Sequence, residues 1–144
     1  MRERSGTNGQ LTNLAALPFA PEVMERAIAD IKPSPRNARK HSKKQIHLIA
    51  ESMRKFGFVS AVLVDANGEL VAGHGRLEAA KLLGLTEVPT VCLDHLDADQ
   101  IRALRIADNR LAEHSSWDTE ILKVELGALI ESDFAVDLTG FETA

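Results

Sequence analysis

Residues 71–89 read VAGHGRLEAAKLLGLTEVP, and the order of patterns in this stretch decides the fold. The apolar run before Gly73 is typical of a strand. Apolar residues after it recur at helical spacing, at Leu77, Ala80 and Leu83, which predicts a helix over 75–83. Gly84 is suited to end that helix, and EVPTVCL after it predicts another strand. The GHGR sequence therefore lies where a strand turns into a helix.

The flanking sequence extends this unit into an α+β fold. Apolar spacing and end residues predict an edge strand at 23–31, a helix that begins after Ser42 and ends at Gly57, a hairpin formed by SAVLV and ELVA, and two later helices opening near 97–99 and 117–118. Ser42 and Gln45 have the spacing of a capping box. The second arm of the hairpin leads directly into GHGR, so this turn is held by the sheet.

The GHGR turn has two interpretations. In the first, two residues without Cβ let backbone N–H groups at a helix N-terminus approach an anion, and Arg76 adds a bidentate contact to phosphate oxygens. In the second, the glycines only supply positive φ angles for a tight turn. Neither interpretation requires His74 to take part in chemistry.

Composition indicates one soluble domain, which we expect to be cytoplasmic, with no membrane partner. The 144 residues are 44% hydrophobic and 26% charged, and no apolar run approaches a membrane span. Residues 1–60 hold 11 Lys and Arg against 5 Asp and Glu, whereas residues 61–144 hold 6 against 16. The excess of Lys and Arg in residues 1–60 suggests weak, sequence-independent contact with the DNA backbone, or else a solvated surface. The residues proposed for DNA are Lys32, Arg36, Lys40, Lys43 and Lys44.

A longer stretch of the sequence, with several motifs in order, resembles a known family. The stretch PRNARKHSKKQIHLIAESMRKFGFVSAVLVDANGELVAGHGRLEAAKLLGLTEVP is similar to the N-terminal domain of ParB-like proteins, within the ParB/sulfiredoxin superfamily. The resemblance implies a small mixed sheet flanked by helices, with a helical C-terminal part. It also implies a nucleotide site for CTP or ATP with Mg²⁺, and it carries the name "ParB-like nuclease". ADNRLAEHSSWD resembles the ParB-like domains found with phage or plasmid DNA methyltransferases.

The resemblance carries over to individual positions. Gly73 and Arg76 match the family's glycine- and arginine-containing box, Arg39 matches the arginine of its first loop, and Asn109 its third motif. Nucleotide or phosphate contacts are therefore expected from Arg39, Gly73, His74, Gly75, Arg76, Asn109 and Arg110, with a metal-linked role for Asp108.

Two departures from the family pattern leave alternatives open. His74 and Gly75 stand where ParB has glutamate and arginine, so one charge toward the triphosphate is missing. Ala112 stands where the third motif has arginine, so either Arg110 replaces it or that contact is absent.

The enzyme class also stays open between a nuclease and an NTP hydrolase. His74 with Arg76 is one catalytic candidate; acids at Glu78, Asp94 and Asp108 with His95 are the others. Sulfiredoxin activity is not expected, because imidazole at position 74 cannot replace a thiol nucleophile and Cys92 lies on a predicted buried strand. A non-catalytic interaction module is the remaining alternative.

The expected organisation is a disordered arm at 1–20, a ParB-like domain at 21–115 and a helical extension at 116–144 that packs on it. The last predicted helix is acidic, so we expect no sequence-specific DNA reader in this polypeptide. Partners implied by the resemblance are a nucleotide, a DNA-modifying protein and a second copy in a homodimer. The predicted function is nucleotide or phosphate binding within DNA partitioning, modification or phage-related DNA metabolism.

Overall fold

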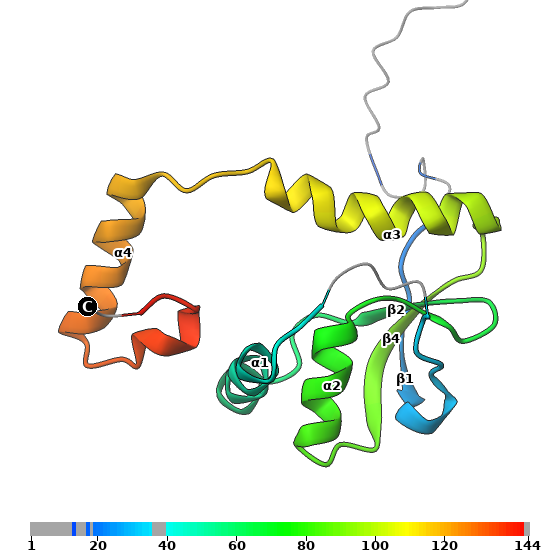
Figure 1. The fold of residues 1–144 in the computed structure, drawn as a ribbon, viewed down its shortest axis with the longest axis horizontal. Coiled ribbons are helices and arrows are strands. Elements are labelled where there is room, and N and C mark those ends of the chain that lie inside the picture. Colours follow the sequence, from blue (N-terminus) through cyan, green and yellow to red (C-terminus); the bar gives the residue numbers. More distant parts are fainter. Residues whose placement is uncertain (1–12, 14–16, 18, 36–39, 143–144) are drawn as a thin grey trace, which may run out of the picture.

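A four-stranded mixed sheet forms the centre of the molecule and confirms the predicted α+β class (Figure 1). The computed structural model describes residues 13, 17, 19–35 and 40–142. The strands are β1 (Val23–Ala27), β2 (Val62–Asp65), β3 (Leu70–Ala72) and β4 (Glu87–Leu93), in the spatial order β1-β4-β2-β3. β4 runs parallel to β2 and antiparallel to β1, and β2 and β3 form the predicted hairpin.

The described chain has four α-helices, and the side chain just before each of three of them explains where that helix starts. α1 (Lys43–Phe56), α3 (Ala98–Glu113) and α4 (Thr119–Glu131) begin after Ser42, Asp97 and Asp118, whose oxygens accept N–H groups of the first turn. α2 (His74–Leu82) begins after Gly73, which has no side chain to cap it. The N–H groups at the start of α2 are thus left for other acceptors.

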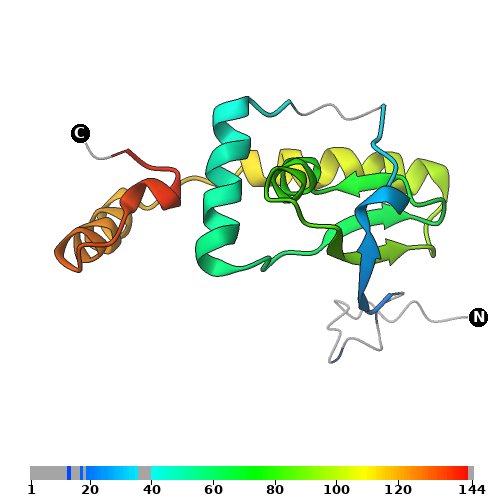
Figure 2. The same cartoon turned by 90° about the horizontal axis from the view of Figure 1, so that it is seen from below.

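Helices cover both faces of the sheet. α2 packs on one face, α3 crosses the other, and α1 lies against α2 (Figures 1 and 2). The core between the sheet and α2 includes Val62, Val64, Leu70, Leu77 and Val88, while Val71, Val91, Leu93 and Ile101 pack between the sheet and α3. Burying apolar area on both faces fixes the end of β3, and with it the turn into α2.

Three predicted details of the elements were wrong. The strand expected over 23–31 ends at Ala27, because the chain then forms a 3-10 helix (Ile28–Asp30). α2 begins one residue before Gly75, since only Gly73 takes the left-handed conformation. The reciprocal capping box lies at Asp97 and Gln100 rather than at Ser42, which only accepts the N–H of Gln45.

The C-terminal part lies beside α1 rather than on the sheet (Figure 1). Its 3-10 helix (Val136–Thr139) contacts α1, Phe134 stacks on Phe56 with ring centroids 6.2 Å apart, and Glu142 pairs with Lys44. The division at residue 115 stays a prediction. The predicted arm at 1–20 falls almost wholly outside the described residues. Within the part of the chain that is described, no helix is long and apolar enough to cross a membrane.

Candidate functional site

The turn between β3 and α2 is held in place by two glycines with different tasks. Gly73 has φ +99°, and a Cβ on it would lie 2.8 Å from Val62 Cγ1. Gly75 is helical, and a Cβ there would lie 3.0 Å from Ile49 Cδ1 and 3.1 Å from Cε1 of His41. The first glycine permits the backbone conformation, and the second lets α1 and the His41 ring approach the first turn of α2.

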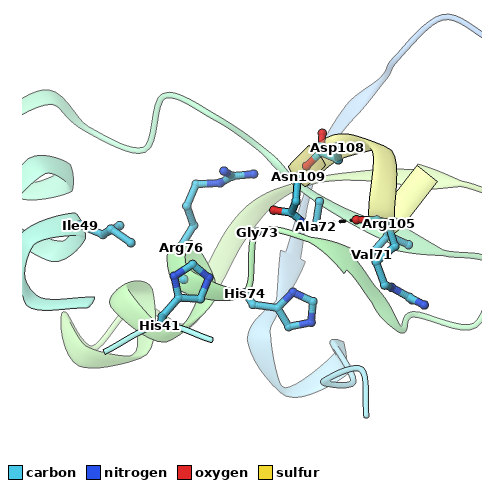
Figure 3. Close-up of a pocket in the computed structure, with 11 residues that line it drawn as sticks. His41, Ile49, Val71, Ala72, Gly73, His74, Arg76, Arg105, Asp108 and Asn109 are labelled. Atoms are coloured by element: carbon cyan, nitrogen blue, oxygen red, sulfur yellow. Dashed lines mark hydrogen bonds between the residues drawn. The ribbon is translucent and has the colours of Figure 1, made fainter. Parts of the chain in front are cut away.

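A pocket of about 280 Å³ opens in front of this turn (Figure 3). Its wall is built by three parts of the chain: the segment before α1 with α1 itself, the end of β3 with the start of α2, and the middle of α3. The lining residues are His41, Ile49, Val71, Ala72, Gly73, His74, Gly75, Arg76, Arg105, Asp108 and Asn109. The α2 N-terminus therefore faces a cavity rather than bulk solvent.

Arg76 is half-buried and anchored at one end of its guanidinium. Its Nη2 donates to the carbonyl oxygen of Ala61 at 3.0 Å. Figure 3 shows the side chain reaching toward the end of α3 that carries Asp108 and Asn109. Burial lowers the pKa of Arg76, and the Asp108 carboxylate opposes that shift. Arg76 keeps its positive charge, and the hydrogen bond to Ala61, just before β2, fixes the orientation of the guanidinium.

Arg105 is a second cation on the pocket wall. Its side chain is only 10% exposed, Nη2 donates to the carbonyl oxygen of Leu70 at 3.3 Å, and the same nitrogen lies 3.7 Å from Glu69 Oε1. Asn109, one turn later on α3, donates from Nδ2 to the carbonyl oxygen of Arg105 at 3.1 Å. These contacts tie α3 to the hairpin.

Buried nitrogens without a hydrogen-bond partner gather around this pocket. Among the described residues, the buried side-chain nitrogen and oxygen atoms that have no partner are four, and all belong to pocket-lining side chains: His41 Nδ1, His74 Nε2, Arg76 Nε and Arg105 Nε. Leaving such a group unsatisfied costs about 1–3 kcal/mol. An anion with several acceptor oxygens would satisfy them together.

The electrostatics of His74 agree with this interpretation. Burial lowers its pKa most, the positive charges of Arg105 and His41 lower it further, and Glu78 acts in the opposite direction. Burial, together with the nearby positive charges, therefore keeps the imidazole neutral near pH 7, and a bound anion would offset the part that comes from those charges.

The same site offers little to a metal ion alone. Asp108 is the one carboxylate among the lining residues, and no group of three His, Cys, Asp or Glu among the described residues could hold a metal. Mg²⁺ commonly binds through one or two carboxylates together with substrate phosphates. The residues fit Mg²⁺ only in company with phosphate oxygens, and the metal-linked role of Asp108 stays a prediction.

The structure brings most of the predicted nucleotide residues together. Gly73, His74, Gly75, Arg76 and Asn109 all line the pocket with Asp108. Arg110 does not: it is exposed and pairs with Glu113 at 2.7 Å. Arg39 and Arg36 lie outside the described residues.

The other candidates lie elsewhere. Glu78 pairs with Lys81, the ring of His95 stacks on Phe19, and Cys92 Sγ on β4 donates to the Asp65 carbonyl oxygen. Lys32, Lys40, Lys43 and Lys44 are exposed and form no part of the pocket wall.

Two pocket residues were missed by sequence reasoning. The sequence around His41 is typical of an exposed segment, and Arg105 is one of several arginines on a predicted helix. The available signal for Arg105 was its position four residues before Asn109, which places both on one helical face. No comparable local signal marks His41.

Comparison with known proteins agrees with this geometry. The family model described as "ParB N-terminal domain" matches residues 19–110, more than half of the chain. The chain belongs to the ParB N-terminal domain family. The predicted resemblance is thereby confirmed, and the pocket lies at the family's glycine- and arginine-containing box.

Two relatives of this ParB domain differ in how much of their length it covers. The ParB-like nuclease domain-containing protein YnaK of Escherichia coli K12 is 38% identical over 79 residues, which are 55% of this chain and 91% of YnaK. The chromosome-partitioning protein Spo0J of Thermus thermophilus is 36% identical over 98 residues, which are 65% of this chain and 36% of Spo0J. This ParB domain thus spans only about a third of the partitioning relative.

A solved structure shares the fold. The C-terminally truncated chromosome-partitioning protein ParB of Caulobacter crescentus, complexed with CTP-γ-S, matches with a TM-score of 0.65 and 22% identity. The match covers 77% of this chain and 64% of that protein. At that identity the likeness establishes the ParB fold.

Proposed function

We propose that this domain binds the phosphate groups of a nucleoside triphosphate, CTP or ATP with Mg²⁺, in the pocket at the start of α2. The observation that carries the proposal is the convergence of four buried, unpartnered nitrogens on one pocket. Phosphate oxygens are strong acceptors for such donors, and bidentate contacts to arginine are among the strongest. A related protein of the same fold was solved with CTP-γ-S, which supports a nucleotide as the source of the phosphate.

Each part of the pocket has a distinct task in this proposal. The N–H groups at the start of α2 and the positive end of the helix dipole face the anion. Arg76 and Arg105 supply fixed positive charge, each anchored to a backbone carbonyl oxygen. Mg²⁺ bound with the nucleotide would neutralise phosphate charge, and Asp108 on the pocket wall would be its protein ligand. Gly73 keeps the backbone close enough for contact.

The proposed context is DNA partitioning, modification or phage-related DNA metabolism, because partitioning proteins and a ParB-like nuclease domain protein are among the relatives. DNA contact would come from exposed lysines such as Lys43 and would be weak, sequence-independent and strongly salt-dependent. A gel shift at two salt concentrations tests this, and tight binding of one sequence would contradict it.

Isothermal calorimetry with CTP, ATP, GTP and UTP, each with Mg²⁺, tests the nucleotide site. We expect at least one nucleotide to bind, and Arg76→Lys to weaken binding about tenfold because lysine keeps the charge but loses the planar fork. Arg102→Lys, on the exposed side of α3, is the matched control. The proposal fails if none of the four nucleotides binds, or if Arg76→Lys and Arg76→Ala both bind as well as the unaltered protein.

Hydrolysis of the bound nucleotide is a second candidate function, favoured by one observation. His74 has a buried, unpartnered Nε2 on the pocket wall and a lowered pKa, so its neutral imidazole could accept a proton from water. Phosphate release by the unaltered protein and by His74→Gln, both saturated with nucleotide, tests it. Equal rates would remove His74 from any hydrolytic step.

A further inference from the structure

Two of the four unpartnered nitrogens belong to histidine rings from different parts of the chain. His74 opens α2, whereas His41 precedes α1 and reaches the pocket over Gly75. Nδ1 of His41 would lie 3.2 Å from a Cβ at Gly75, so the ring occupies the space that the missing side chain leaves. The two rings and the two arginines thus line the same cavity.

A carboxylate opposes the charge of each arginine in the pocket. Arg105 lies 3.7 Å from Glu69, and Arg76 is under the influence of Asp108. Arg105 on α3 and Glu78 on α2 act on His74, Asp108 on α3 acts on Arg76, and Glu69 at the start of β3's side of the hairpin lies near Arg105. With two arginines opposed by carboxylates, a phosphate that carries two negative charges lacks a full countercharge unless the imidazoles become protonated.

The free protein opposes that protonation, and an anion would reverse the opposition. The pKa of His74 is lowered by burial first, then by Arg105 and His41. An anion among these groups offsets the repulsion from Arg105 and accepts a hydrogen bond from the charged ring, and both effects favour imidazolium. Phosphate and protons would then bind together.

We propose that His41 and His74 are phosphate ligands and that His74 takes up a proton as a phosphate binds, so that the pocket prefers a doubly charged terminal phosphate and binds it more tightly as the pH falls. This inference rests on the proposed phosphate site and adds two ligands, His41 and His74, with a linked proton. A protonated His74 donates to the phosphate and is no longer available as a general base, so the inference also argues against His74 as a hydrolytic residue.

Calorimetry in two buffers measures the proton directly. CTP with Mg²⁺ and, separately, sodium sulfate are titrated into the protein near pH 7 in PIPES and in Tris, whose ionisation enthalpies differ. We expect apparent enthalpies that differ by the uptake of about one proton, and dissociation constants for sulfate that fall by up to about tenfold per pH unit between about pH 8 and pH 6. Sulfate does not titrate in this range, so its protons come from the protein.

Substitutions that keep a donor but cannot ionise locate the protons. His74→Gln keeps an amide N–H near Nε2, and His41→Asn keeps one near Nδ1. For the double variant we expect no proton uptake and a flat pH profile, so that its affinity falls furthest below that of the unaltered protein near pH 6. His47→Gln, on the exposed side of α1, is the control and should keep the uptake.

The possible results separate this inference from the proposed function. Binding with equal enthalpies in both buffers and no pH dependence would overturn the proton linkage while leaving the phosphate site intact. Uptake that persists in the double variant would place the proton on the nucleotide or on another group and would also overturn it. Failure of both CTP and sulfate to bind at every pH would instead contradict the phosphate site itself.

Discussion

Two cationic regions of the described chain differ in burial, and one of them lines a cavity. The lysines at 40–44 are the densest basic run of the described sequence, yet they are exposed, and Lys44 already pairs with Glu142 at 3.2 Å. The pocket has only two arginines, but both are largely withdrawn from solvent, and each is anchored to a backbone carbonyl oxygen.

Burial makes the smaller group of charges the more specific one. Two unit charges 4 Å apart interact about four times more strongly at an effective dielectric constant near 20 than in water. Exposed pairs are also screened by salt and contribute little. The pocket therefore has the fixed geometry that a single bound phosphate needs, whereas the lysine surface suits a diffuse partner such as a nucleic acid backbone.

Of the substitutions that distinguish the pocket from the exposed lysines, Gly73→Ala should have the largest effect on stability. Its φ of +99° and the 2.8 Å approach to Val62 leave no room for a methyl group, so we expect a loss of about 2–4 kcal/mol and a melting temperature lower by about 10 °C. Nucleotide binding should fall as well, because the turn must move. Thermal denaturation and calorimetry measure the two effects.

Gly127→Ala provides the matched control. Gly127 lies within α4 with nothing within 4 Å of an added Cβ, so alanine should stabilise the protein by about 0.5–1 kcal/mol. If both substitutions changed stability equally, the turn at Gly73 would tolerate a side chain as well as an ordinary helical position does. The inference that this turn is rigid would then be wrong.

The next effect should come from Arg105→Gln. Glutamine keeps an N–H donor near the position of Nε, but it loses the positive charge and the contact with the Leu70 carbonyl oxygen, and we expect nucleotide affinity to fall about tenfold to a hundredfold. Lys43→Gln removes one charge from the exposed region and should leave nucleotide affinity unchanged. Calorimetry at two salt concentrations compares them, and a similar loss for both variants would mean that net charge, not the pocket, sets the affinity.

Sequence reasoning placed the GHGR turn between a strand and a helix, but it did not find all the residues of the pocket wall. The strand, the GHGR turn and the helix after it follow from local periodicity, because neighbouring residues carry all the information. Gly75 shows the limit of that reasoning. Its pattern indicated a second positive φ, whereas its task is to admit the His41 ring, a contact between segments more than thirty residues apart.

Arg105 shows the same limit on a larger scale. Its position on α3 was predictable, but its placement on the pocket wall depends on α3 crossing the sheet beside β3. Tertiary packing of that kind leaves no periodic signal in one sequence. The same packing turns Arg110 away toward Glu113, although it adjoins Asn109 in the chain.

The smallest effect should be on the pH dependence of stability, and it distinguishes a pocket histidine from an exposed one. Because the pKa of His74 is lowered in the folded protein, the unfolded chain binds more protons than the folded one as the pH falls below about 6.5. The contribution of His74 is thus present above that pH and lost below it. The melting temperature of the unaltered protein should fall more between about pH 7.5 and pH 5.5 than that of His74→Gln, and exposed His47→Gln should follow the unaltered protein.

Saturating sulfate should shrink the difference between the unaltered protein and His74→Gln, since an anion in the pocket stabilises the protonated ring. A wider gap with sulfate, or parallel profiles for all three proteins without it, would show that His74 does not sense the charge of the pocket.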